Sequence, residues 1–366
     1  MTASHDAPET APVANPPYRR IATEEAFCPP DMLDVYKRLI EAGKVDDPGF
    51  NTMFGFYLSS PSERARIIAS QLGDLGAQRL AHMDAAGVDH AVLALTSPGV
   101  QVMEKADAVA YATYANDWLV DNIRRHPDRY SGLAAVAPQD PAAAAKEIAR
   151  AKALGLRGVI INSHTGHEYL DDPKFWPIFE AAEQLEMPIY LHPYTPSKQM
   201  IQPFLEKGLD GAIFGFSVET GLHMLRIIIA GVFDRFPKLQ MILGHTGEAL
   251  PFWLYRLDYM HRAGVVSKRY EAMQPLQRKV SDYLRENVHY TNSGVAWAPS
   301  IRFVQDVIGV DRVMYAMDYP YQYVPGEVGI LDRMDMPAEV KKQFFQTNAE
   351  RLFRIAPADA ATGAAA

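Results

Sequence analysis

Two histidines and two carboxylates stand where predicted strands end, and together they could hold a divalent cation. His192 and His245 each close a short apolar run, IYLH and MILGH. Glu24 ends the first such run of the chain and Asp318 ends the last. Imidazole nitrogens and carboxylate oxygens are suitable ligands for Mn²⁺, Zn²⁺ or Mg²⁺. We therefore expect a metal site if the fold brings these four strand ends together.

Each of these residues also has a plainer structural interpretation. A single histidine at a strand end is more often structural than a ligand, and an aspartate there commonly caps the following helix. Side chains alternate along a strand, so only one of Glu24 and Glu25 can face a metal. The only cysteine, Cys28, can form neither an internal disulfide nor a thiolate zinc cage, and we interpret it as structural.

Eight apolar runs rich in β-branched residues alternate with longer segments of helical periodicity. Strands are predicted at 20–24, 90–96, 130–137, 156–162, 188–192, 239–245, 288–292 and 312–318. Helices are predicted at 62–86, 105–126, 141–154, 173–185, 220–236, 249–261 with 275–286, 298–308 and 337–353. This alternation predicts an α/β fold, a (β/α)8 TIM barrel, in which the carboxyl ends of all strands meet at one mouth. A doubly wound open sheet is the alternative, but no glycine-rich nucleotide-binding motif follows the first strand.

The chain is predicted to form one domain with two tails. Residues 1–17, rich in alanine and proline, are expected to be a disordered tail, and 357–366 a flexible one. Residues 18–356 form the single barrel domain. Within it, 30–61 is an insertion after the first strand, and its aromatic residues suit a loop packed over the barrel mouth. A satellite hydrophobic cluster that ties down a long loop is an equally good interpretation.

Composition excludes several classes of function. The 366 residues are 48% hydrophobic and 22% charged, which is typical of a globular protein. The net charge of −8 is the wrong sign for a surface that binds nucleic acid or anionic lipid. No apolar stretch reaches the ~18 residues of a membrane span, and the first residues lack the features of a signal peptide. We expect a cytoplasmic protein.

Several short motifs resemble those of the amidohydrolase superfamily, in its branch of metal-dependent aromatic acid decarboxylases. They are IATEEAF at 21–27, His-Pro at 192–193, GHTGE at 244–248 and DYP at 318–320. Four further motifs are similar to those of the 5-carboxyvanillate decarboxylases, whose relatives act on γ-resorcylate and 2,3-dihydroxybenzoate: GFY at 55–57, SPSER at 60–64, NSGVAW at 292–297 and YPYQY at 319–323. The resemblance implies an amidohydrolase-type barrel that acts on a small aromatic carboxylic acid.

The resemblance also implies roles for individual residues. The implied metal ligands are Glu24, His192 and Asp318, and the implied catalytic residues are Asp318, His245 and Glu248. The substrate would be bound by Arg64, Arg256 and Tyr321. Thr96, at the end of the second predicted strand, and Phe54, in the aromatic insertion, are added as substrate-binding candidates from their positions in the sequence. The implied cofactor is one divalent ion, Mn²⁺ before Zn²⁺ or Mg²⁺, with no organic cofactor. The implied assembly is a homodimer or a higher homo-oligomer.

Two departures from the hydrolases of the superfamily favour one metal ion over two. Their first-strand His-x-His motif is replaced by Glu24-Glu25-Ala26, and the fourth strand ends in Asn162, with no lysine there to bridge two ions. The implied reaction is a decarboxylation in which Asp318 protonates the ring carbon that bears the carboxylate, while His245, oriented by Glu248, holds the carboxylate or shares the proton. A mononuclear hydrolase of a lactone or an amide, and a catalytically idle ligand-binding barrel, are the alternatives.

Overall fold

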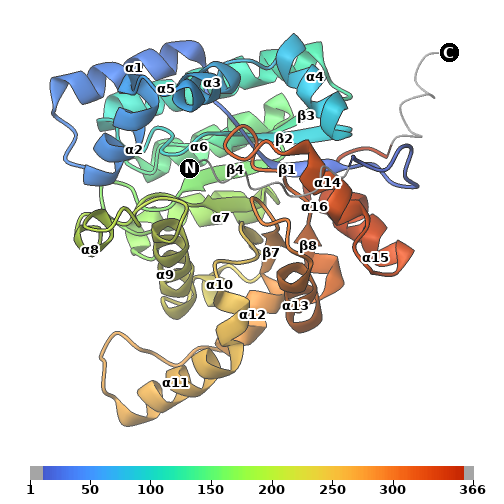
Figure 1. Ribbon diagram of the computed structural model, residues 1–366. Coiled ribbons are helices and arrows are strands. Elements are labelled where there is room, and N and C mark those ends of the chain that lie inside the picture. Colours follow the sequence, from blue (N-terminus) through green and yellow to red (C-terminus); the bar gives the residue numbers. More distant parts are fainter. Residues whose placement is uncertain (1–10, 358–366) are drawn as a thin grey trace.

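The structure, a computed structural model that describes residues 11–357, is built around eight parallel strands in sequential order (Figure 1). The strands are β1 (Ile21–Phe27), β2 (His90–Leu95), β3 (Tyr130–Ala135), β4 (Gly158–Asn162), β5 (Ile189–His192), β6 (Met241–Leu243), β7 (Val288–Thr291) and β8 (Val313–Met314). Hydrogen bonds between β1 and the segment that follows β8 close the sheet into a barrel. The N–H of Thr23 donates to the Tyr315 carbonyl (3.1 Å), and the N–H of Ala26 donates to the Tyr319 carbonyl (2.8 Å). The predicted (β/α)8 barrel is confirmed.

The last strand is much shorter than the predicted 312–318. It ends at Met314 because the N–H groups that follow have acceptors outside the sheet. Tyr315 donates to the carbonyl of Phe344 (2.9 Å), and Ala316 donates to the side-chain oxygen of Asn292 (3.0 Å). The backbone from Tyr315 to Asp318 is therefore fixed by individual hydrogen bonds rather than by strand pairing.

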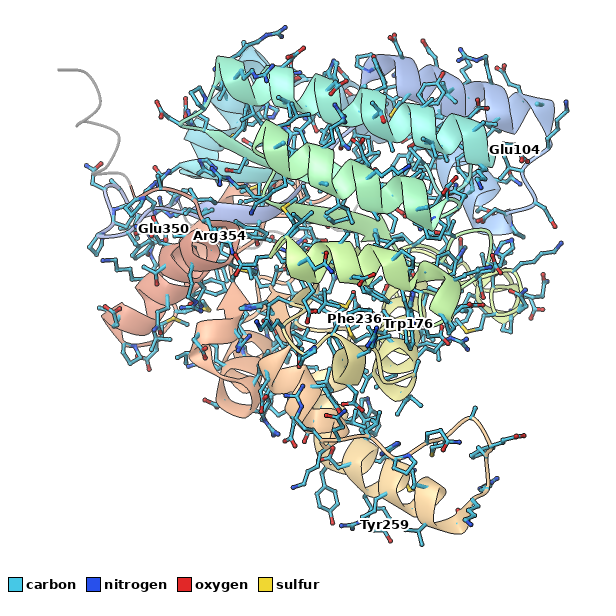
Figure 2. All side chains as sticks on the ribbon, turned by 180° about the vertical axis from the view of Figure 1, so that it is seen from behind. Glu104, Trp176, Phe236, Tyr259, Glu350 and Arg354 are labelled. Atoms are coloured by element: carbon cyan, nitrogen blue, oxygen red, sulfur yellow. The ribbon has the colours of Figure 1, made fainter. Side chains whose placement is uncertain are left out.

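Helices cover the outside of the barrel. They are α1 (Pro30–Ala42), α2 (Pro48–Ser59), α3 (Glu63–Leu72), α4 (Ala77–Ala86), α5 (Lys105–Arg125), α6 (Pro141–Leu154), α7 (Trp176–Gln184), α8 (Gln202–Leu205), α9 (Gly215–Ile229), α10 (Val232–Arg235), α11 (Leu254–Ser267), α12 (Val280–Glu286), α13 (Ala298–Ile308), α14 (Pro325–Asp332), α15 (Ala338–Lys342) and α16 (Asn348–Phe353). Their inner faces pack on the sheet and on each other; Trp176, for example, packs edge-on against Phe236 with ring centroids 6.0 Å apart (Figure 2). Among residues 11–357, no helix is both long and apolar enough to cross a bilayer.

Several predicted helices are divided, and four helices were not predicted. The predicted 62–86 breaks into α3 and α4 around residues 73–76, and the predicted 220–236 begins at Gly215 and breaks at Gly231, which has a left-handed φ of +76°. The predicted 337–353 contains a π-helical turn at Gln343–Thr347. Helices α1, α2, α8 and α14 lie in segments where no helix was predicted, whereas α6 and α13 have the predicted bounds.

The insertion after β1 is helical and packs on the loops at the carboxyl ends of the strands. Helix α2 is capped by Asp47, whose carboxylate accepts the N–H of Phe50 (2.9 Å). The rings of Tyr36, Phe50 and Phe54 contact one another, with centroids 4.9 to 6.0 Å apart. The hydroxyl of Tyr36 donates to the carbonyl of Gly99, in the loop after β2 (2.6 Å). This contact ties both helices of the insertion to the barrel.

At the opposite end of the barrel, one buried aspartate organises the start of the chain. Asp332 at the end of α14 accepts hydrogen bonds from Arg20 Nε (3.0 Å) and Nη2 (2.7 Å), from the Tyr18 hydroxyl (2.9 Å) and from the Val13 N–H (2.8 Å). The side chains of Arg20 and Asp332 are 4% and 0% exposed. Residues 13–20, which include part of the predicted tail, are thus held to the barrel; residues 1–10 and 358–366, also predicted as tails, lie outside the described residues.

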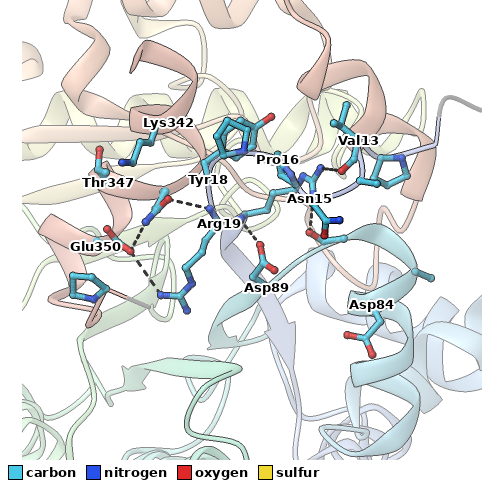
Figure 3. A pocket seen from close by; sticks show the side chains of 18 residues that line it. Val13, Asn15, Pro16, Tyr18, Arg19, Asp84, Asp89, Lys342, Thr347 and Glu350 are labelled. Atoms are coloured by element: carbon cyan, nitrogen blue, oxygen red, sulfur yellow. Dashed lines mark hydrogen bonds and ion pairs between the residues drawn. The ribbon is translucent and has the colours of Figure 1, made fainter. Parts of the chain in front are cut away.

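The same segment encloses a cavity of about 880 Å³ at the amino-terminal ends of β1 and β2 (Figure 3). Its walls include the backbone of residues 12–20, Asp84 and Asp89 on one side, and Lys342 and Glu350 on the other. In TIM barrels this end contributes to stability, and chemistry takes place at the carboxyl ends of the strands. We therefore assign the cavity no role in the reaction.

Replacing Asp332 with alanine should destabilise the protein by about 3–5 kcal/mol, because it leaves the Arg20 guanidinium buried and unpaired. Urea denaturation followed by circular dichroism measures the loss. The matched control is Asp311→Ala. It removes the ion pair between Arg312 and Asp311, whose side chain is 55% exposed, and should lower the free energy of unfolding by less than ~1 kcal/mol. Equal effects of the two substitutions would contradict the role given to Asp332.

Candidate metal centre and active site

Three of the predicted strand-end residues meet at the carboxyl end of the barrel. Glu24 lies on β1, is 3% exposed and points its Oε1 atom at two histidines. The distance from this oxygen is 3.3 Å to Nε2 of His192, at the end of β5, and 3.7 Å to Nε2 of His245, which follows β6. The barrel thus assembles one carboxylate and two imidazoles from strands that are far apart in sequence.

The hydrogen bonds around this cluster leave room for a cation. His192 Nδ1 lies 2.8 Å from the carbonyl of Pro193, so this nitrogen carries the proton and Nε2 presents a lone pair to the Glu24 carboxylate. Oε1 of Glu24 is buried and has no hydrogen-bond partner among residues 11–357. A carboxylate oxygen and an imidazole lone pair that face each other repel unless a positive charge lies between them. The donor set therefore fits a divalent metal ion.

The other oxygen of Glu24 is fixed by two hydroxyl groups. Oε2 accepts hydrogen bonds from the Tyr190 hydroxyl, on β5, and from Oγ1 of Thr291, on β7 (3.1 Å). Gly244 gives the carboxylate the space it needs, because a Cβ atom at that position would lie 2.8 Å from Oε2. Sequence analysis missed both hydroxyl groups. Tyr190 could have been found from the alternation along β5, which places it on the same face as His192, two residues on.

Asp318 belongs to the same electrostatic cluster. Burial and the nearby charge of Glu24 raise the pKa of Asp318 to about 8, while His245 and His192 act in the opposite direction. Burial also raises the pKa of Glu24, but His245 and His192 outweigh it, so the net shift of this pKa is downward. A buried and a half-buried carboxylate that influence each other in this way are typical of a site that takes up either a proton or a cation.

His245 and Glu248 form a hydrogen-bonded pair on strained backbone. Nδ1 of His245 lies 2.8 Å from Oε1 of Glu248. Burial lowers the pKa of His245, but Glu248 and Glu24 outweigh it and raise this pKa to about 10. All five residues from His245 to Ala249 have positive φ, between +52° and +85°. A non-glycine residue pays about 1–2 kcal/mol for this conformation, which is typical of functional sites held in place by their surroundings.

A second group of predicted residues forms one wall of the mouth. The Tyr321 hydroxyl lies 2.5 Å from Oγ1 of Thr96, and the Tyr321 carbonyl accepts from Nη2 of Arg64 (3.0 Å). The ring of Tyr57 contacts that of Tyr321, with centroids 5.6 Å apart. Phe54 is 1% exposed and packs edge-on against Tyr57, with centroids 6.2 Å apart, and its role in substrate binding stays a prediction. The wall combines two phenols with an exposed guanidinium.

Arg256 lies apart from these residues. It is exposed on α11 and lines a groove together with Glu248. Its guanidinium makes no hydrogen bond or ion pair with any of residues 11–357. The role in substrate binding implied for Arg256 stays a prediction.

A second cluster of possible metal ligands, Asp47, His164 and His167, lies where α2 meets the loop after β4. All four ring nitrogens of the two histidines already face backbone groups. In His164, Nδ1 accepts the His167 N–H (3.3 Å) and Nε2 donates to the Thr195 carbonyl (3.1 Å). In His167, Nδ1 accepts the Lys198 N–H (3.2 Å) and Nε2 donates to the Asp46 carbonyl (2.7 Å). No imidazole lone pair is left for a metal. This cluster fastens the insertion to the barrel.

An eight-stranded parallel barrel with a buried carboxylate and imidazole site at its mouth defines the class of metal-dependent TIM-barrel enzymes. The chain belongs to the amidohydrolase family, whose profile matches residues 16–355.

Several relatives are similar over nearly their whole length. A structure of 5-carboxyvanillate decarboxylase LigW2 from Novosphingobium aromaticivorans, with bound manganese and 3-methoxy-4-hydroxy-5-nitrobenzoic acid, is 56% identical, covers 94% of this chain and 99% of that chain, and has a TM-score of 0.92. The structure of LigW from Sphingomonas paucimobilis is 40% identical, covers 92% and 99% of the two chains, and has a TM-score of 0.87. The gamma-resorcylate decarboxylase of Polaromonas sp. is 30% identical over 345 residues, which are 92% of this chain and 98% of that protein.

Replacing Tyr190 with phenylalanine should weaken metal binding by about 10–100-fold, because the hydroxyl that orients Glu24 is lost. Competition with a fluorescent chelator measures the affinity. The matched control is Tyr130→Phe on β3, since the Tyr130 hydroxyl is buried and has no hydrogen-bond partner among the described residues. Wild-type affinity in Tyr190→Phe would show that this hydroxyl does not orient the ligand.

Proposed function

We propose that the protein catalyses the non-oxidative, metal-dependent decarboxylation of a hydroxylated aromatic acid, 5-carboxyvanillate, to vanillate and CO₂. The observation that carries this proposal is the 56% identity to 5-carboxyvanillate decarboxylase LigW2 over 94% of the chain. The unpartnered oxygen of Glu24 between two imidazoles supports it, because that enzyme contains manganese. Breakdown of lignin-derived aromatic acids in the cytoplasm is the setting that we propose.

Glu24, His192 and Asp318 would hold the ion, for which we propose Mn²⁺, with Zn²⁺ or Mg²⁺ as alternatives. When bound, the metal supplies Lewis acidity toward the phenolic oxygen and one carboxylate oxygen of the substrate. The oxygen-rich ligand set suits Mn²⁺ and Mg²⁺, and the imidazole also suits Zn²⁺.

The side chains around the ion handle the proton. Asp318 donates a proton to the ring carbon that bears the leaving carboxylate. The bond from that carbon to the carboxylate then breaks, its electron pair returns to the ring, and CO₂ leaves. Solvent supplies one proton per turnover to restore Asp318.

His245 and the aromatic wall orient the substrate. The imidazolium of His245, held by Glu248 at 2.8 Å, attracts the carboxylate that will leave. The rings of Tyr321 and Tyr57 suit the face of a planar aromatic acid. The guanidinium of Arg64 beside them suits the carboxylate that stays on the ring, since its fork matches two oxygens.

A homo-oligomer is part of the proposal, and α11 is the element that supports it. This helix projects from the rest of the molecule (Figure 1), and Tyr259 lies on it far from the barrel (Figure 2). Large side chains on and beside it are exposed, among them Tyr255 (83%), Val266 (78%) and Phe252 (70%). Between α9 and α11 lies an apolar groove of about 960 Å³. A second copy could both fill the groove and cover the projecting helix.

The protein loaded with Mn²⁺ should convert 5-carboxyvanillate to vanillate, and conversion should stop when the metal is removed by a chelator. Absorbance and released CO₂ measure the reaction. The same assay tests 2,6- and 2,3-dihydroxybenzoate as alternative substrates. If all three acids stayed intact with metal bound, the proposed decarboxylase function would be contradicted. Lactones would then be tried as substrates of the alternative hydrolase.

Asp318→Asn should lower turnover by at least about 10²–10⁴-fold, the usual contribution of positioned proton transfer, while binding of the aromatic acid stays measurable. Steady-state kinetics and titration with 5-carboxyvanillate measure the two effects. Near-normal turnover in this variant would mean that another group, such as His245, delivers the proton.

Val266→Glu should shift the mass measured by light scattering from a multiple of 40.8 kDa toward a single chain, because it puts a charge on the projecting helix. The control is Ile67→Glu, which changes a residue 46% exposed on α3 and should leave the mass unchanged. A wild-type mass of one chain would contradict the proposed oligomer.

A further inference from the structure

The second of the two adjacent acids on β1, Glu25, is buried and turned away from the metal site. It is 4% exposed, yet both of its oxygens have backbone partners. Oε1 accepts the N–H of Met317 (2.9 Å), and Oε2 accepts the N–H of Tyr319 (3.2 Å). These two N–H groups flank Asp318. One carboxylate from the first strand therefore holds the backbone on both sides of the acid that follows the last strand.

The backbone between these two hydrogen bonds is strained. Asp318 has a φ of +72°, in the left-handed region that non-glycine residues avoid. Such a conformation persists only where neighbouring groups fix it. No strand pairing does so here, because β8 has already ended at Met314. Three groups hold this turn. The Ala26 N–H donates to the Tyr319 carbonyl (2.8 Å), the Gln322 N–H donates to the Asp318 carbonyl (2.8 Å), and Glu25 accepts the N–H groups on both sides of Asp318.

Helix α4 supports the same turn from the outside. The guanidinium of Arg79, a residue 1% exposed, lies 4.0 Å above the ring of Tyr319 and donates to the Ala26 carbonyl (2.6 Å). His82 Nδ1 lies 2.8 Å from the Tyr319 hydroxyl. Burial raises the pKa of Glu25 to about 7, while the Met317 N–H and the charge of Arg79 act in the opposite direction. Arg79 thus holds the end of β1 and the ring of Tyr319 together beside Glu25.

We propose that Glu25 is a positioning residue that holds the backbone of Asp318 in the left-handed conformation and so directs its carboxylate toward Glu24 and His192. The inference rests on the proposed role of Asp318 as a metal ligand. The paired acids of β1 then have separate tasks. Glu24 is a ligand itself, and Glu25 places the ligand that comes from the other end of the chain.

The first experiment measures Mn²⁺ affinity of the metal-free protein by chelator competition, without substrate, in wild type, Glu25→Gln and Glu25→Asp. Glutamine keeps only one acceptor oxygen, and aspartate keeps the charge but its carboxylate is one methylene too short to reach both N–H groups. We expect both variants to bind Mn²⁺ at least about 10-fold more weakly, as is usual when the support of a ligand is lost. Wild-type affinity in Glu25→Asp would overturn the proposal, because charge alone would then suffice.

The second experiment asks whether Glu25 acts through Asp318. In an Asp318→Ala background, Glu25→Gln should change Mn²⁺ affinity by less than about twofold, since the ligand that it places is gone. Additive losses in the double variant would overturn the proposal. If Asp318→Ala itself bound Mn²⁺ with wild-type affinity, Asp318 would not be a metal ligand. The proposed role of Glu25 would then be overturned as well.

Glu219→Gln is the matched control for loss of a buried carboxylate. Glu219 on α9 also accepts a backbone N–H, that of Ser197 (3.1 Å), and burial raises its pKa to about 7 as well. Both glutamine variants should lower the melting temperature, and only Glu25→Gln should lower Mn²⁺ affinity; equal affinity losses would overturn the proposal. Because the readout needs no substrate, failure of 5-carboxyvanillate to react would contradict the proposed function alone.

Discussion

Burial of the Glu24 carboxylate is the constraint on which the rest of the site depends. A charged carboxylate without partners in a barrel interior costs several kcal/mol, so each of its oxygens must be matched. The hydroxyls of Tyr190 and Thr291 satisfy one oxygen, and Gly244 leaves the space for it. The other oxygen faces His192 and has no hydrogen-bond donor among residues 11–357. This oxygen is therefore available to a cation.

Backbone strain occurs at two of the loops that carry chemistry, and in each case a distant part of the chain maintains it. The left-handed run that begins at His245 is held by the Thr246 N–H, which donates to the Thr291 carbonyl (2.8 Å). The left-handed turn at Asp318 is held by Glu25. Each side chain is thereby pre-organised before a ligand arrives, and the free energy for this comes from packing elsewhere in the fold.

The sequence was sufficient to predict the barrel and the meeting of Glu24, His192 and His245, because strand periodicity places each residue on its strand or just after it. The predicted strand end at Glu24 was wrong, since β1 runs on to Phe27 and Glu24 lies in its middle. It was not sufficient for α1 and α2. The latter contains Gly49 and Gly55 among aromatic residues, a composition that weakens the helical signal, and tertiary contacts decide the outcome. Tyr190 was missed because a tyrosine in an apolar strand is usually a core residue. The short β8 could not be foreseen, since the Phe344 carbonyl and the Asn292 side chain, which accept the N–H groups of Tyr315 and Ala316, are brought there only by the folded chain.

Closure of the barrel and formation of the metal site are the same structural event. Strand β1 is joined to the last third of the chain at its start by Arg20 and Asp332, in its middle by Thr23 and the Tyr315 carbonyl, and at its end by Ala26 and the Tyr319 carbonyl. Only when these contacts form does Glu24 approach the acid that follows β8. A metal that binds both carboxylates binds the closed barrel and not the open chain, so its binding free energy adds to the stability of the fold. The contact of Arg20 with Asp332 thus anchors the start of the same strand that carries Glu24.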